Sequence, residues 1–207
     1  ERAFMPWLDM KAEMERLGLP LYTMESKDPL TAFDAVGFTL QYELSYTNIL
    51  AMLDLAGIPF YSKDRDESWP LIVAGGPCAC NPEPLSDFID LFCLGESESQ
   101  LNELMELYRV AKKERQSKDS FLRHAAKIDG VYVPSLYAVS YHEDGTIAAI
   151  KPQADAPAVV TKRIEQDLDK SYYPEKFLVP YIEVVHDRVM EELMRGCVRG
   201  CRFCQAG

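Results

Sequence analysis

The sequence has little positive charge for its length and no long apolar run. Its 207 residues carry 22 Lys plus Arg against 33 Asp plus Glu, which gives a formal net charge of −11. That balance argues against general nucleic-acid binding and against a membrane-surface protein, because both need a basic face. No segment approaches the ~20 consecutive apolar residues that a membrane helix requires, and no signal peptide opens the chain. We therefore predict a soluble, cytoplasmic protein with no membrane partner.

The sequence also lacks the common catalytic signatures. It holds three His residues, with no sign of a Ser–His–Asp triad, and it has no glycine-rich phosphate loop. Its hydrophobic fraction of 47% is too high for intrinsic disorder, and its length suits one large or two small domains. Because the chain opens at Glu1 without an initiator Met and stops three residues after its densest motif, we expect a fragment of a longer protein.

Short apolar strands alternate with helical periodicity over the first 130 residues. The expected helices cover 8–17, 45–56 and 97–115, and the expected strands cover 35–40, 71–74 and 90–94, with weaker strand signals at 2–6 and 21–24. This alternation predicts an α/β fold with a doubly wound parallel sheet and helices on both faces. We expect residues 1–130 to form this Rossmann-type domain.

The pattern changes after about residue 130. The pair Asp144-Gly145, between alternating segments at 137–141 and 146–150, is a strong signal for a β-hairpin. We expect residues 131–180 to form a small β-rich connector, with a further strand at 159–162. Residues 181–207 then contain two more expected strands, 182–185 and 189–194, which lead into a group of cysteines.

Three of the six cysteines lie within the last eleven residues in the pattern Cys-x3-Cys-x2-Cys: Cys197, Cys201 and Cys204. Thiols this close in sequence indicate a metal or redox site in a reducing compartment rather than disulfides. Three thiolates on one tight loop can each bind one iron of a [4Fe-4S] cluster and leave the fourth iron open. The alternative is a structural zinc site with a fourth ligand such as His186, although zinc motifs usually pair cysteines as Cys-x2-Cys.

The residues around these cysteines suit an anionic cluster. Gly196 and Gly200 allow the backbone to curl without Cβ clashes. Arg195, Arg199 and Arg202 add positive charge, which favours thiolates. The remaining cysteines lie in apolar or turn-like surroundings, where we expect small buried thiols, with metal binding by the Cys-x-Cys pair as the alternative: Cys78, Cys80 and Cys93.

The segment R-G-C-V-R-G-C-R-F-C-Q-A-G, residues 195–207, resembles the cluster loop of the radical S-adenosylmethionine (SAM) superfamily. The resemblance implies that Cys197, Cys201 and Cys204 hold a [4Fe-4S] cluster whose open iron is chelated by SAM. It places Phe203, the aromatic residue before the third cysteine, near the adenine. It also implies reductive cleavage of SAM to a 5′-deoxyadenosyl radical, and an electron donor such as flavodoxin or ferredoxin. The strand before Cys197 would begin the superfamily's α/β barrel.

The upstream half carries a second resemblance. Gly75-Gly76-Pro77, N-P-E-P at 81–84, residues 90–94 and Gly95-Glu96 are similar to the N-terminal domain of radical enzymes with a cobalamin-binding-like fold. The segment 38–48, together with the cysteine loop, resembles one uncharacterised branch of that group. The resemblance implies a strand and a helix before Glu1, and ligand contacts at Gly75, Gly76, Gly95 and Glu96. The alternatives are a strand-end turn without a ligand at the two glycines and helix capping by Glu96.

Cobalamin binding depends on a motif that the chain does not show. Cobalamin domains that use a protein His as the cobalt ligand carry Asp-x-His-x2-Gly, and none of His124, His142 and His186 sits in such a motif. Three interpretations stay open: the motif precedes Glu1, cobalamin binds without a His ligand, or the domain does not bind it.

We therefore predict the N-terminal part of an iron–sulfur enzyme that, in full length, cleaves SAM reductively to modify a substrate that the sequence does not reveal. Methyl transfer, methylthio transfer and RNA or protein modification all fit. We expect residues 1–207 alone to be inactive, because most of the barrel is missing. The alternatives are a non-catalytic zinc-binding protein and a module that binds a corrinoid or a macromolecular partner.

Overall fold

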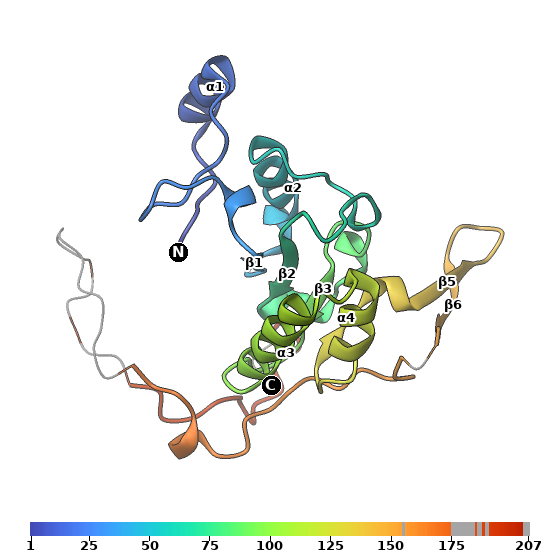
Figure 1. Cartoon of the computed structure of the whole chain (residues 1–207). Helices are drawn as coiled ribbons and strands as arrows, with labels where there is room; N and C mark the ends of the chain where they lie inside the picture. Colours follow the sequence, from blue (N-terminus) through green and yellow to red (C-terminus); the bar gives the residue numbers. More distant parts are fainter. Residues whose placement is uncertain (155, 175–184, 186–187, 189–190, 205–207) are drawn as a thin grey trace. The chain divides into compact units, whose positions relative to one another are not determined.

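The computed structural model describes residues 1–154, 156–174, 185, 188 and 191–204. It divides the chain into two compact units, Glu1–Ile164 and Glu165–Gly207 (Figure 1). None of the described helices is long and apolar enough to cross a membrane.

The first unit is built on a four-stranded sheet. Its strands are β1 (Ala35–Thr39), β2 (Leu71–Gly75), β3 (Leu91–Cys93) and β4 (Val131–Tyr132), and they lie side by side in that order. The first three strands run parallel, as predicted, whereas β4 runs antiparallel to β3. The sequence did not predict β4, and its direction departs from the parallel arrangement of the three predicted strands. Two helices separate β3 from β4, so the chain reverses once more before it re-enters the sheet.

Helices cover both faces of this sheet, which confirms the α/β class. They are α2 (Tyr46–Leu55) on one face and α3 (Gln100–Glu114) and α4 (Lys118–Ala125) on the other. The first helix, α1 (Leu8–Leu17), contributes the buried Met14 to the core on the α2 side. Along β2, Ile72 and Ala74 pack in the core that contains residues of α2, while Leu71 and Val73 pack in the core that contains residues of α3 and α4. The described strands lie in chain order, so the reversal of strand order that marks a doubly wound sheet is not among them.

A hairpin follows the sheet, as predicted. It consists of β5 (Tyr137–Tyr141) and β6 (Ile147–Pro152), which pair antiparallel. Its turn contains Gly145 with φ of +83°, and the Asp144 carboxylate accepts a hydrogen bond from the Thr146 N–H at 2.9 Å. The Asp-Gly signal therefore identified this turn correctly.

The three predicted helices and the three main predicted strands of the first domain are all present within a few residues. The weaker signals were wrong: residues 2–6, 21–24 and 159–162 form no strand, although Tyr22 makes one isolated bridge to Pro29. The structure adds α4 and β4, which the sequence did not predict. Short 3-10 helices occupy further turns: Leu30–Ala32, Glu43–Ser45, Ser62–Asp64, Pro77–Cys80, Glu83–Leu85, Pro134–Leu136 and Leu168–Lys170.

The second unit has little regular structure among its described residues. Its one described helical segment is the 3-10 turn Leu168–Lys170. Residues 191–194 form no strand, which contradicts that part of the strand predicted at 189–194. The rest of that predicted strand, and all of the one at 182–185 except Val185, lie outside the described residues.

Candidate functional site

The cysteine loop lies in the second unit. Its described residues, 191–204, form no helix or strand, and a turn joins the last two cysteines, in which the Cys204 N–H donates to the Cys201 carbonyl oxygen at 3.0 Å. Gly196 and Gly200 have φ of +78° and +62°, the left-handed region that glycine adopts without strain. These two glycines therefore do what the sequence predicts: they let the backbone turn sharply on either side of Cys197.

None of the three cysteines of the loop forms a disulfide, and all three are exposed. Across the described ranges, no three His, Cys, Asp or Glu side chains converge on a point where they would hold a metal ion. The structure thus places the predicted ligands on one loop but leaves their sulfur atoms apart. The donor set nevertheless fits a [4Fe-4S] cluster, because thiolates are the ligands of such clusters and the surroundings of Gly200 are open.

The charges beside the cysteines are partly compensated. Arg195 forms a bidentate ion pair with Glu192, in which the Nε–Oε1 distance is 2.8 Å and the Nη2–Oε2 distance is 2.9 Å. This pairing lowers the pKa of Glu192 below its ordinary value. Arg199 and Arg202 are exposed, and so is the Phe203 ring, at 93%. Two of the three predicted arginines and the predicted aromatic residue therefore face solvent.

The turn at Gly75-Gly76 has a packing role at the carboxyl end of β2. The Leu40 N–H donates to the Gly75 carbonyl oxygen at 2.6 Å, and the Cys78 N–H donates to the Leu40 carbonyl oxygen at 3.0 Å. Gly76 has φ of +102°, and a Cβ there would lie 3.0 Å from the Leu40 carbonyl oxygen. Gly76 therefore lets this turn approach the Leu40 backbone closely, whereas a Cβ at Gly75 would make only ordinary contact with Cys93, at 3.5 Å from its carbonyl oxygen. A ligand contact at Gly75 or Gly76 stays a prediction.

Gly95 has a similar role at the end of β3. Its φ is +95°, and a Cβ would lie 2.1 Å from the carbonyl oxygen of Arg163. That carbonyl accepts the Glu96 N–H at 2.9 Å, and the Arg163 N–H donates to the Leu94 carbonyl oxygen at 2.9 Å. A returning segment of the same unit therefore lies against Gly95. Ligand contacts at Gly95 and Glu96 likewise stay predictions.

The other three cysteines differ from one another. Cys78 and Cys93 are buried, as predicted, whereas Cys80 is exposed, which contradicts the prediction. Burial raises the pKa of the Cys93 thiol to about 11. The pKa of Cys78 is also raised, first by burial and then by the Glu43 carboxylate. Neither buried thiol has the lowered pKa of a reactive cysteine.

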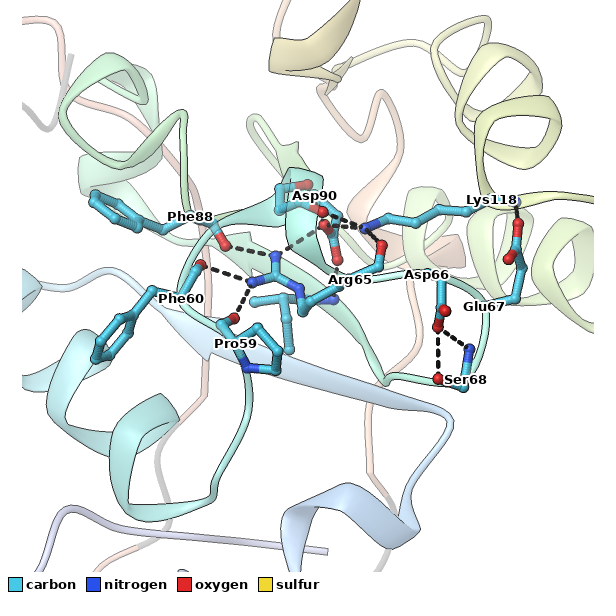
Figure 2. Close-up of polar contacts among 11 residues, drawn as sticks. Pro59, Phe60, Arg65, Asp66, Glu67, Ser68, Phe88, Asp90 and Lys118 are labelled. Atoms are coloured by element: carbon cyan, nitrogen blue, oxygen red, sulfur yellow. Dashed lines mark hydrogen bonds and ion pairs between the residues drawn. The ribbon is translucent and has the colours of Figure 1, made fainter.

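A buried ion cluster was missed by the sequence analysis. Arg65 lies in the acidic stretch 64–67, whose composition is typical of a solvated loop. The side chains of Arg65 and Asp90 are nevertheless both fully buried, and the distance from Arg65 Nη2 to Asp90 Oδ1 is 2.9 Å (Figure 2). Lys118 Nζ lies 2.8 Å from the same Asp90 oxygen, and the other oxygen accepts the Ile72 N–H at 2.7 Å. A single arginine between acidic residues carries no sequence pattern that would indicate its burial.

This ion cluster is a structural feature. Arg65 donates to the carbonyl oxygens of Pro59 at 2.7 Å, Phe60 at 2.8 Å and Phe88 at 2.7 Å, and Figure 2 shows the guanidinium enclosed by them. Asp90 immediately precedes β3, so the cluster lies at the amino ends of the strands, away from the glycine turns. Its polar atoms, apart from Arg65 Nε, which has no partner among the described residues, join loop 59–65, the amino ends of two strands and the start of α4.

Comparison with known proteins assigns the first unit to a family. A family model described as "Radical SAM proteins, N-terminal" matches residues 1–134, about two thirds of the chain. The chain belongs to the radical SAM proteins. It is also 26% identical over 202 residues to an uncharacterized protein of Methanocaldococcus jannaschii, a match that covers 92% of this chain and 34% of that protein. The chain thus spans about a third of the length of this relative. No solved structure matches it.

The radical SAM assignment is independent of the cysteine loop. The match ends at residue 134, and the first cysteine of the loop is Cys197. Two separate parts of the chain therefore point to the same superfamily: a sheet domain by its overall similarity, and a loop by the spacing of three thiols. The ion cluster and the glycine turns lie within the matched region.

Proposed function

We propose that the full-length protein is an iron–sulfur radical SAM enzyme, and that Cys197, Cys201 and Cys204 are the protein ligands of its [4Fe-4S] cluster. The observation that carries the proposal is the Cys-x3-Cys-x2-Cys loop in a chain whose first 134 residues match a radical SAM family. When bound, such a cluster supplies the electron for reductive cleavage of SAM at its open iron. No residue of the described ranges identifies the substrate that is modified.

The residues of the loop have distinct roles in this proposal. Three exposed thiols supply the ligands, and the left-handed conformations of Gly196 and Gly200 allow the loop to close around the cluster. Arg199 and Arg202 stabilise the thiolates electrostatically, since Arg195 is already paired with Glu192. The exposed Phe203 ring stacks near the adenine of SAM.

The partners follow from the same chemistry. A reductant such as flavodoxin or ferredoxin, met in the cytoplasm, would supply the electron, and the exposed Arg199 and Arg202 would offer an acidic carrier a basic contact on an otherwise acidic chain. The first unit would act as an accessory domain. Cobalamin would need a site without a His ligand among the described residues, because His124 and His142 lie on α4 and in the hairpin turn rather than at the carboxyl ends of the parallel strands β1, β2 and β3.

The decisive experiment is anaerobic reconstitution of the full-length protein with iron and sulfide, followed by electron paramagnetic resonance with and without SAM. We expect a reduced four-iron signal that changes when SAM is added and that is lost in Cys201→Ala. Cys80→Ala is the matched control, because Cys80 is also a free, exposed thiol but lies outside the motif. Zinc in place of iron after anaerobic purification, or a cluster indifferent to SAM, would refute the proposal in favour of a structural metal loop.

A further inference from the structure

The second and third cysteines of the loop lie at the two ends of one turn. The Cys204 N–H donates to the Cys201 carbonyl oxygen at 3.0 Å, and Arg202 and Phe203 form the centre of this turn. The first and last Cα atoms of a turn closed in this way lie less than about 7 Å apart. A disulfide requires a Cα–Cα distance of about 4.4–6.8 Å. The turn therefore holds Cys201 and Cys204 at a separation that a disulfide can bridge.

Cys197 belongs to a different turn. Residues 198–199 form the centre of that turn, and Gly200, with φ of +62°, lies between it and the turn that ends at Cys204. The left-handed conformation of Gly200 changes the direction of the backbone between Cys197 and Cys201. The three cysteines are therefore not equivalent, because one turn holds two of them together and Cys197 precedes that turn.

The thiols of this loop are accessible to dissolved oxidants. All three cysteines are exposed, and so is the Phe203 ring at the centre of the second turn. The earlier Cys-x-Cys pair differs, because Cys78 is buried and only Cys80 is exposed. Thiol oxidation is selective for accessible cysteines that have a second cysteine within reach. In this chain Cys201 and Cys204 meet both conditions.

We propose that, when the loop holds no cluster, Cys201 and Cys204 form a reversible disulfide that withdraws two of the three cluster ligands. This inference rests on the proposed function, since it concerns the regulation of the same site. In a reducing compartment such a disulfide is transient and redox-sensing rather than structural. Loading of the cluster then requires prior reduction of the loop, so the thiol redox state controls how much of the protein can become active.

The oxidant in this step is a small-molecule disulfide, RSSR. The thiolate of one cysteine attacks one sulfur of RSSR, which forms a mixed disulfide and releases RS⁻. The thiolate of the other cysteine then attacks the protein sulfur of the mixed disulfide, which forms the Cys201–Cys204 bond and releases a second RS⁻. Overall, two protein thiols are oxidised, and RSSR is reduced to two RSH, which take up the two protons that the cysteines lose. The second attack is intramolecular, so the high effective concentration across the turn favours it over reaction with further RSSR.

Peptide mapping of the full-length, cluster-free protein tests the pairing. The protein is incubated with oxidised glutathione as the RSSR probe, alkylated with iodoacetamide and digested with trypsin without reduction. Arg199 and Arg202 lie between the three cysteines, so each cysteine falls on a separate peptide. We expect the Cys201–Cys204 cross-link to exceed all cross-links to Cys197 by at least about tenfold. Equal amounts of the three possible pairs, or mixed disulfides that persist on all three cysteines, would overturn the proposal.

Cys197→Ser is the matched control variant, because it removes an exposed cysteine of the same loop and leaves the second turn unchanged. We expect this variant to form the Cys201–Cys204 disulfide at a rate within about twofold of the wild type. Cys201→Ser should instead leave Cys204 as a stable mixed disulfide with glutathione. Loss of the Cys201–Cys204 cross-link in Cys197→Ser would show that Cys197 is needed for it and would overturn the assignment to one turn.

A second arm tests the effect on cluster loading. A carrier protein that donates a preformed [4Fe-4S] cluster is added anaerobically, in buffer without thiols, to the oxidised protein and to a portion that has been reduced again with a phosphine. Iron content and cluster absorbance measure the uptake, which we expect only in the reduced portion. Equal uptake by both portions would overturn the regulatory role and leave the cluster proposal intact. Uptake by neither portion would refute the cluster proposal and, with it, the regulation, so the two failures are distinguishable.

Discussion

Arg65 and Asp90 form a fully buried ion pair that joins the loop before β2 to the residue before β3, 25 positions apart in the chain. Such a pair is costly to desolvate, and it contributes to stability only when the remaining hydrogen-bonding groups are satisfied. Here three backbone carbonyls, the Ile72 N–H and Lys118 satisfy most of these groups, while the buried Arg65 Nε has no partner among the described residues. The pair therefore holds the amino ends of two strands in register.

We expect Asp90→Asn to lower the free energy of unfolding by about 3 kcal/mol, because removing one partner leaves the buried guanidinium without its counter-charge. Urea denaturation gives the value directly. The control is Asp87→Asn, the same substitution at an exposed site three residues away, which should change stability by less than about 0.5 kcal/mol. Equal effects from the two substitutions would contradict a stabilising role for the buried pair.

Gly95→Ala should be strongly destabilising, by about 3 kcal/mol or more, because the new methyl group would meet the Arg163 backbone at 2.1 Å and φ is positive. The control is Gly145→Ala, where φ is also positive but nothing lies within 4 Å, so only the conformational cost of about 1–2 kcal/mol applies. Thermal unfolding of both variants measures the difference. If the two losses are the same, the close approach of the segment at Arg163 is wrong.

The burial of Cys93 makes its thiol unreactive. With its pKa raised to about 11, Cys93 should resist iodoacetamide at pH 8 in the folded protein, whereas the exposed Cys80 should be alkylated readily. Mass spectrometry of the digested protein reads both sites at once. Labelling of Cys93 at the rate of Cys80 would show that this side of the sheet opens to solvent.

The same shift predicts a pH dependence of stability. A thiol whose pKa is raised from 9.0 in the unfolded chain to about 11 in the folded one stays protonated up to a higher pH in the folded protein. The contribution of the buried, protonated thiol to the free energy of unfolding is therefore complete below pH 9 and is lost as the pH rises from 9 toward 11. Cys93→Ala should show a shallower fall in stability over that window than the wild type, as measured by urea denaturation at each pH. If stability falls with pH equally steeply in Cys93→Ala and in the wild type, the raised pKa of Cys93 is contradicted.

Residues 1–207 alone should not turn over SAM, because the chain spans about a third of its relative and the remainder would contain most of the catalytic barrel. The measurement is the formation of methionine and 5′-deoxyadenosine from SAM after anaerobic reconstitution and reduction. The full-length protein under the same conditions is the positive control. Product formation by residues 1–207 alone would show that the loop and the described units suffice.

Local chemistry explains what was predictable from the sequence. The helix at 8–17, the Asp144-Gly145 hairpin and the strands at 35–40 and 71–74 are each specified by periodicity, a turn signal or an apolar run within a few residues. The spacing of Cys197, Cys201 and Cys204 is likewise local, and it indicates iron–sulfur chemistry whatever the fold around it.

Long-range packing decided the rest. The antiparallel direction of β4 depends on α4, a helix of eight residues too short to be recognised from its periodicity alone. The burial of Arg65 depends on Asp90, Lys118 and three carbonyl groups that meet only in the folded sheet. Gly95 is required by the return of Arg163, 68 positions later. Sequence alone thus determined most of the helices and strands of the first unit and the superfamily to which the chain belongs. The tertiary structure decided which charges are buried and where the backbone must approach closely, because both depend on residues brought together from distant parts of the chain.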